Sequence, residues 1–181
     1  MPAFIVEDGT IVPEATSYVT VAEADDYLSI KSNAADWTAL ADGVVQNYLM
    51  WATRILDQRA VFPNSTPTEP DNQSLRWPRQ YAYDREGDLI PDDVIPDQIK
   101  EATIEIAFNL FDQGIDPSSG GSSGSAGGAI KRIKAAVVEI EYTEGVSATT
   151  SAFPTGINDI LYPLGSIAGV GGSRGVPIRR A

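Results

Sequence analysis

The sequence predicts a mainly α-helical domain: a small bundle of three to four helices with a β-hairpin and an extended, Gly-rich C-terminal tail. Two observations support this prediction. Apolar residues recur at helical spacing in two long segments, and one later segment alternates apolar and acidic residues, as a half-buried strand does. A chain of 181 residues with 43% hydrophobic residues is long enough for one domain with its own core. We expect this domain to span residues 1–165 and the flexible tail to span residues 166–181.

The N-terminal part is predicted to contain a turn, two extended pieces and a helix. Asp8-Gly9 favours a tight turn after a short strand, because glycine adopts positive φ at low cost, and residues 17–19 form the second extended piece. Thr20 and Glu23 have the spacing of a capping box, in which each side chain satisfies a free backbone N–H at a helix start. The first helix is therefore predicted over residues 21–30.

Two longer helices follow. The segment 42–59 has a one-sided apolar face. The clearest helix starts at Pro96, where proline suits the first helical position, and ends near Gly114. Its apolar surface is nearly continuous, so we expect this helix at the centre of the domain. Its polar residues form one narrow stripe: Gln98, Glu101, Glu105, Asn109 and Asp112.

The remaining segments are shorter or irregular. Six prolines between residues 63 and 97 predict an ordered loop, anchored by Trp77 and Tyr81. The Gly/Ser-rich segment 114–129 is expected to be a flexible loop. A β region follows at 130–144, in which Val138 to Tyr142 alternate and pair with a neighbouring strand. A short helix is expected near residues 158–161.

The composition argues against catalysis. The chain has no His and no Cys, which removes the usual general base, the thiolate nucleophile and zinc sites. We expect no cofactor, no metal and no enzymatic activity. A hydrolase that uses only carboxylates, such as the adjacent pairs 25–26 and 92–93, is the least favoured alternative, because such pairs are usually solvated. The acidic loop lacks the spacing of a calcium loop and is expected to be a solvated turn: Asp84, Glu86, Asp88 and Asp92.

Charge and hydropathy restrict the partners. The formal net charge of −12 disfavours tight binding of nucleic acid, because such binding needs clustered Lys and Arg. The glycines from 165 to 175 lack the pattern of a phosphate-binding loop. No segment is apolar enough for a membrane span, and the N-terminus lacks a secretion leader. A cytoplasmic origin without membrane association is the expectation.

Two segments remain open to more than one interpretation. Arg76, Trp77, Pro78 and Arg79 could form an aromatic platform flanked by cations that contacts nucleic acid. We favour the alternative, in which the tryptophan is packed and the arginines reach a neighbouring subunit. The basic end with Arg174, Arg179 and Arg180 is either disordered or a docking peptide for an acidic partner.

The order of several short motifs resembles a family of tailed-bacteriophage head–tail adaptor proteins. The resemblance covers about residues 4 to 165, and it depends on the order of the motifs because each one is short and common. The Gly/Ser segment departs from the family pattern. The matching motifs, in order, are Ile5 to Thr10, Ser17 to Val19, Ala22 to Tyr27, Ala52 to Asp57, Leu75 to Arg79, Ile95 to Ala102 and Val138 to Tyr142.

The resemblance implies a structural, non-enzymatic protein of the virion neck, assembled in the host cytoplasm. It implies a homo-oligomeric ring of about twelve copies between the portal protein and a tail terminator or neck/stopper protein. DNA would pass through this ring without sequence-specific binding. The subunit contact would lie at Arg76 to Arg79. By position, the tail that docks on the portal would be Val176, Pro177, Ile178, Arg179, Arg180 and Ala181.

Some proteins of this kind are labelled as DnaT-like single-stranded DNA-binding proteins. That label implies an alternative function, an accessory protein of phage replication that binds single-stranded DNA. This alternative predicts salt-dependent binding that weakens in Trp77→Ala.

Overall fold

The computed structural model describes residues 3–115, 134–135, 138–139, 153–154 and 156–167. In this part of the chain five helices and six very short strands are present. The mainly α-helical prediction is confirmed. The helices are α1 (Val21–Leu28), α2 (Ala34–Thr38), α3 (Asp42–Arg59), α4 (Asp97–Asp112) and α5 (Ile157–Leu161).

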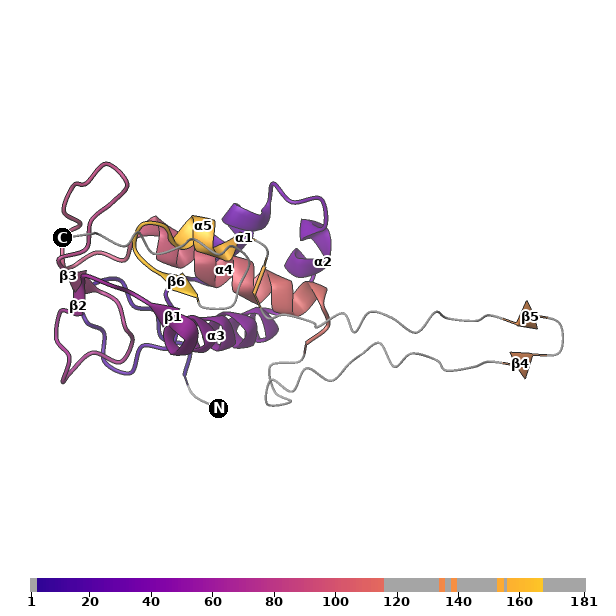
Figure 1. Cartoon of the computed structure of the whole chain (residues 1–181). Helices are drawn as coiled ribbons and strands as arrows, with labels where there is room; N and C mark the ends of the chain where they lie inside the picture. The colour runs from indigo at the N-terminus through magenta and orange to yellow at the C-terminus, as the bar shows by residue number, and fades with distance from the viewer. Residues whose placement is uncertain (1–2, 116–133, 136–137, 140–152, 155, 168–181) are drawn as a thin grey trace, which may run out of the picture.

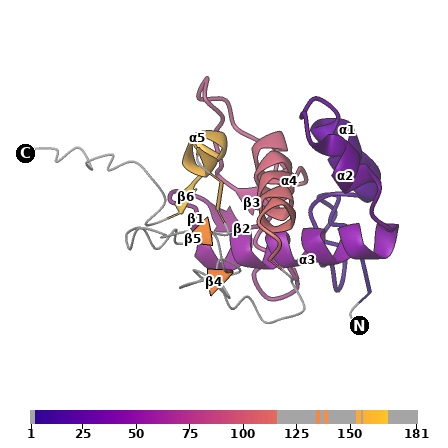
Figure 2. The ribbon, with the colours of Figure 1, turned by 90° about the vertical axis from the view of Figure 1, so that its right-hand side faces the viewer.

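Helix α4 is the centre of the domain, as predicted. Figure 2 shows α4 between α5 on one side and α1 and α2 on the other, with α3 crossing below them. Its main contact is with α3. The apolar side chains of α4 are buried except for Phe111, which is partly buried, whereas the predicted polar stripe is at most partly covered. Burial of this nearly continuous apolar surface supplies much of the driving force for folding.

The helix ends follow the local sequence. The Thr20 hydroxyl accepts from the Glu23 N–H at 3.1 Å, and the Glu23 carboxylate accepts from the Thr20 N–H at 2.8 Å, so the predicted capping box is confirmed. Helix α1 ends at Leu28, two residues before the predicted end. At the end of α4, Gly114 has φ +63° and its N–H donates to Phe111 O, while Ile115 N–H donates to Leu110 O. This is a Schellman ending.

Two details of the helices differ from the prediction. Pro96 is the N-cap residue of α4, with an extended ψ of 145°, and is therefore not the first helical residue. Helix α2 was not predicted, because five residues are too few to show a helical period and Asn33 provides no side-chain cap.

The strands form three two-residue antiparallel pairs (Figure 1). Strand β1 (Ala60–Val61) pairs with β6 (Ser166–Ile167), and β2 (Thr66–Pro67) pairs with β3 (Arg79–Gln80). Of the predicted hairpin, the structure describes the antiparallel pair β4 (Lys134–Ala135) and β5 (Val138–Glu139); the rest of the predicted strand, residues 140–142, lies outside the described residues. Strand β6 therefore joins the first two residues of the predicted tail to the sheet, and Ile167 is buried.

The N-terminal extended pieces are less regular than predicted. They meet in a single parallel bridge between Val6 and Ser17. The turn at Gly9 has the expected positive φ, +106°. Glu7 is buried beneath this turn, and its carboxylate accepts the backbone N–H groups of Gly9, Ile11 and Val12 at 2.9–3.0 Å. The Glu7 carboxylate thus takes the place of the strand–strand hydrogen bonds that the backbone N–H groups of this turn lack.

Most of the Gly/Ser segment and residues 168–181 lie outside the described residues, so their predicted flexibility is untested. Within the described part, no helix is both long and apolar enough to cross a membrane.

Candidate nucleic-acid interface

The segment from Arg76 to Arg79 lies mostly inside the domain. Trp77, Pro78 and Arg79 are buried, and only Arg76 is exposed. The Trp77 ring has no exposed surface and packs edge-on against Phe62 at 5.6 Å between centroids. A base cannot stack on a ring that the chain itself covers. The prediction that Trp77 is packed and anchors the proline-rich loop is therefore confirmed. Its ring is not a platform on which DNA bases could stack.

Polar contacts fix this segment on helix α3. The Tyr18 hydroxyl donates to the Asp57 carboxylate at 2.7 Å and accepts the Trp77 N–H at 3.2 Å. Asp57 also accepts the Arg76 N–H at 3.1 Å. Burial raises the pKa of Asp57, and the two hydrogen bonds oppose this effect only in part. This network is structural, because its groups face the core.

The Arg79 side chain also forms hydrogen bonds within the domain. Its Nη2 donates to the carbonyl oxygen of Ser65 at 2.6 Å and its Nε to the Ser65 hydroxyl at 2.8 Å. These bonds tie β3 to the loop before β2. The favoured prediction placed Arg79 at a subunit contact, but the structure uses its guanidinium within the domain.

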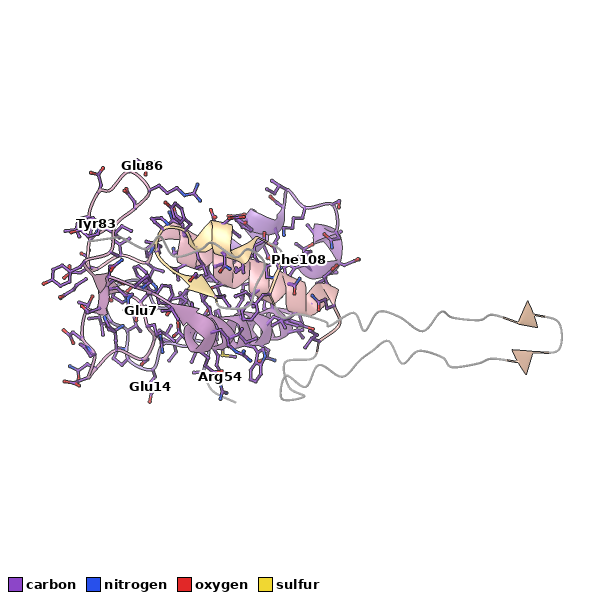
Figure 3. All side chains as sticks on the ribbon, viewed as in Figure 1. Glu7, Glu14, Arg54, Tyr83, Glu86 and Phe108 are labelled. Carbon is purple, nitrogen blue, oxygen red and sulfur yellow. The ribbon has the colours of Figure 1, made fainter. Side chains whose placement is uncertain are left out.

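Three tyrosines carry the exposed aromatic surface of the described residues. Tyr81 is 62% exposed, Tyr83 50% and Tyr162 49%. The prediction that Tyr81 anchors the loop in the core is therefore wrong. Figure 3 shows Tyr83 at the outer edge of the molecule. The intervening Ala82 is buried, and Tyr81 has a left-handed backbone with φ +61°, so the two exposed rings flank a bend in the chain and not a regular strand.

The loop that carries Tyr83 is a small hairpin. Tyr83 and Leu89 form an antiparallel bridge, and the Ile90 N–H donates to Ala82 O at 2.9 Å. The Asp84 carboxylate accepts the N–H groups of Glu86 and Asp88 at 3.0 and 2.8 Å. Asp84 thus builds the turn. Among the described residues no cluster of His, Cys, Asp or Glu is arranged to hold a metal.

Arg85 joins this hairpin to helix α5. Its Nη2 donates to Asp159 O at 2.9 Å and its Nε to Tyr162 O at 3.3 Å. The guanidinium also lies over the Tyr162 ring, with 5.8 Å from Cζ to the centroid. Tyr162 is thereby brought to the same side of the molecule as the hairpin. We call Tyr81, Tyr83, Arg85 and Tyr162 the tyrosine surface.

A cavity of about 590 Å³ lies beside this surface. Partial burial raises the pKa of Glu101 in its wall, and the nearby Asp97 and Glu105 raise it further. So much negative charge repels phosphate. A nucleic-acid strand on the tyrosine surface would keep its phosphates away from the cavity. Its lining residues are Arg85, Glu86, Asp97, Gln98, Glu101, Asp159 and Ile160.

The sequence did not predict this surface. Tyr81, Tyr83 and Arg85 stand at intervals of two, but Tyr81 has φ +61° and Arg85 lies in the turn of the hairpin, so a strand period does not describe their placement. Tyr162 joins the tyrosine surface through its contact with Arg85, which is distant in the sequence, so no local sequence pattern predicts it.

Comparison with known proteins identifies the family. Residues 2–181 match the family described as "Putative DnaT-like ssDNA binding protein", and the chain belongs to this family. No curated protein and no solved structure matches the chain.

This match corrects the favoured functional prediction. The interpretation as a head–tail adaptor of the virion is wrong: the match over nearly the whole chain is to the DnaT-like family, which was the alternative. The adaptor resemblance depended on short, common motifs, and these do not discriminate between families. The expected portal, tail terminator and neck partners depended on the same interpretation. The proposed docking peptide, Val176 to Ala181, lies outside the described residues.

The net charge of −12 conceals an uneven distribution of charged residues along the chain. Residues 1–112 contain seven basic and twenty acidic residues, whereas residues 113–181 contain six basic and five acidic residues. Binding depends on the local charge at the contact, so a net charge of −12 does not exclude a DNA-binding surface.

Proposed function

We propose that this protein binds single-stranded DNA and that bases stack on the tyrosine surface. The observation that carries the proposal is that the exposed Tyr83 and Arg85 share one hairpin, that the exposed Tyr81 stands just before it in the chain, and that Arg85 lies over the exposed Tyr162 ring. Every base has a π face, so stacking on aromatic rings binds single strands without sequence preference and contributes about 1–3 kcal/mol per base. The bases of a duplex are already stacked and paired, which favours the single strand. An accessory role in replication belongs to the same proposal.

The test is a fluorescence-anisotropy titration of labelled oligothymidylate with the purified full chain at low salt. We expect saturable binding that is stronger than binding to a duplex of equal length. Tyr83→Ala should weaken binding by about fivefold or more, which corresponds to the loss of one stacked base. Tyr83→Phe keeps the ring and is the matched control, so it should bind as the wild type does. Absence of binding, or equal binding by Tyr83→Ala and the wild type, would refute the proposal.

A further inference from the structure

Three exposed arginines lie around the C-terminal half of helix α3. Arg54 and Arg59 belong to this helix, and Arg76 follows in the next loop; we call these three residues the arginine surface. In the described part of the chain only Lys31 and Lys100 form ion pairs with carboxylates, to Glu105 and Glu23. The arginine surface forms none there. In a chain this acidic, such cations are available to a polyanion.

The described residues pair none of these arginines with a carboxylate, although Asp57 balances part of the charge of Arg76, whose backbone N–H it accepts. The Arg54 guanidinium lies over the Trp51 ring, 5.4 Å from its centroid, and Figure 3 shows Arg54 at the surface. Its helix neighbours four residues away, Met50 and Gln58, are neutral. The Asp57 carboxylate, three residues after Arg54, accepts the Tyr18 hydroxyl and the Arg76 backbone N–H and forms no ion pair with a guanidinium.

The arginine surface and the tyrosine surface are joined through one segment. Arg76 Nη1 donates to Ala60 O at 3.5 Å, directly after the end of α3. From Arg76 the chain continues through β3 to Tyr81. In Figure 1 the end of α3, β1 and the β2–β3 pair lie at the same end of the domain. Trp77, Pro78 and Arg79 between the two surfaces are buried, so a strand that leaves the tyrosine surface on the side away from the acidic cavity would pass over them to reach Arg76.

We infer that the arginine surface binds the backbone phosphates of the same single strand and so extends the site beyond the stacking tyrosines. This inference rests on the proposed function. Stacking rings combined with a cationic track are the usual composition of sites that bind single strands without sequence preference. Arg54 and Arg59 supply charge, whereas the tyrosines supply stacking, so the two surfaces should respond differently to salt and to oligonucleotide length.

The deciding experiment measures the affinity of Arg54→Gln/Arg59→Gln for oligothymidylates of about four and about sixteen nucleotides over a salt series. Loss of two phosphate contacts should weaken binding of the long oligonucleotide by about tenfold and reduce its log–log salt slope by about 1.4. The short oligonucleotide, which occupies only the tyrosine surface, should be little affected. Arg54→Lys/Arg59→Lys keeps both charges and should retain most of the affinity.

The matched control is Lys31→Gln/Lys100→Gln, which removes the same charge from residues that are ion-paired elsewhere. Its salt slope should equal that of the wild type. If the arginine variant binds the long oligonucleotide as this control does, the inference is wrong, although the tyrosine surface can still bind DNA. If the wild type binds neither oligonucleotide, the proposed function fails and the inference fails with it.

Discussion

Tyr81 combines a left-handed backbone, φ +61°, with an exposed side chain. A non-glycine residue in this region costs about 1–2 kcal/mol, and a ring that is 62% exposed gains little from burial in return. A sequence selected only for stability would place Gly here. The strain is understandable if the ring is needed outside, where the proposed function uses it.

Replacing Tyr81 with Gly separates these two effects. Tyr81→Gly relieves the backbone strain but adds about 0.5–1 kcal/mol of glycine flexibility, so the free energy of unfolding should be unchanged or slightly higher. Affinity for single-stranded DNA should fall. Tyr83→Gly is the control, because Tyr83 has no positive φ and should lose both stability and affinity. Urea unfolding and anisotropy measure the two quantities; a clear loss of stability in Tyr81→Gly would contradict the strain argument.

Asp57 makes stability depend on pH. Because burial raises its pKa, the folded protein binds this proton more tightly than the unfolded chain does. The contribution of Asp57 to stability is therefore greatest below the ordinary Asp pKa and is lost as pH rises through the folded pKa. Asp57→Asn does not titrate. The free energy of unfolding of the wild type, relative to this variant, should decrease as pH rises above about 4. A difference that is constant or increases across this range in urea titrations would show that the pKa is not raised.

At the scale of elements, prediction succeeded where a helix is long enough to repeat its pattern. Helix α3 has the predicted bounds, and α4 differs only at Pro96. The capping box of α1 was visible because it is purely local. Apart from β5, which begins the segment predicted from its alternation, the described strands are too short for alternation to identify, and β1 pairs with β6 across more than a hundred residues. Such pairing is set by tertiary packing and leaves no local pattern.

Two exposed glycines test the helix assignments. An added Cβ would meet no atom within 4 Å at either Gly43 or Gly114, but Gly43 lies inside α3, whereas Gly114 has φ +63°. Gly43→Ala should raise the free energy of unfolding by about 0.5–1 kcal/mol, because alanine favours helix. Gly114→Ala should lower it by about 1 kcal/mol, because the Schellman ending needs the left-handed backbone. Thermal unfolding of both variants provides the comparison; equal effects would contradict the α4 ending.

At the scale of the whole molecule, composition predicted the fold class better than the function. The apolar content and the helical periods were enough for a mainly α-helical domain. Net charge did not reveal that residues 1–112, although rich in acidic residues, contain three exposed arginines that pair with no carboxylate in the described part of the chain. The sequence shows that Tyr81, Tyr83 and Arg85 are close along the chain, but not that all three are exposed, because Tyr81 is left-handed and Arg85 lies in a turn. The approach of Tyr162 also requires the fold.

The central claim is that single-stranded DNA stacks on the tyrosine surface. Photo-crosslinking of the full chain to oligothymidylate, with the linked residues mapped by mass spectrometry, tests this claim most directly. Crosslinks should occur at Tyr81, Tyr83 or Tyr162 and decrease when unlabelled single strand competes. Crosslinks confined to other parts of the chain at saturating DNA, with none at these three tyrosines, would contradict it.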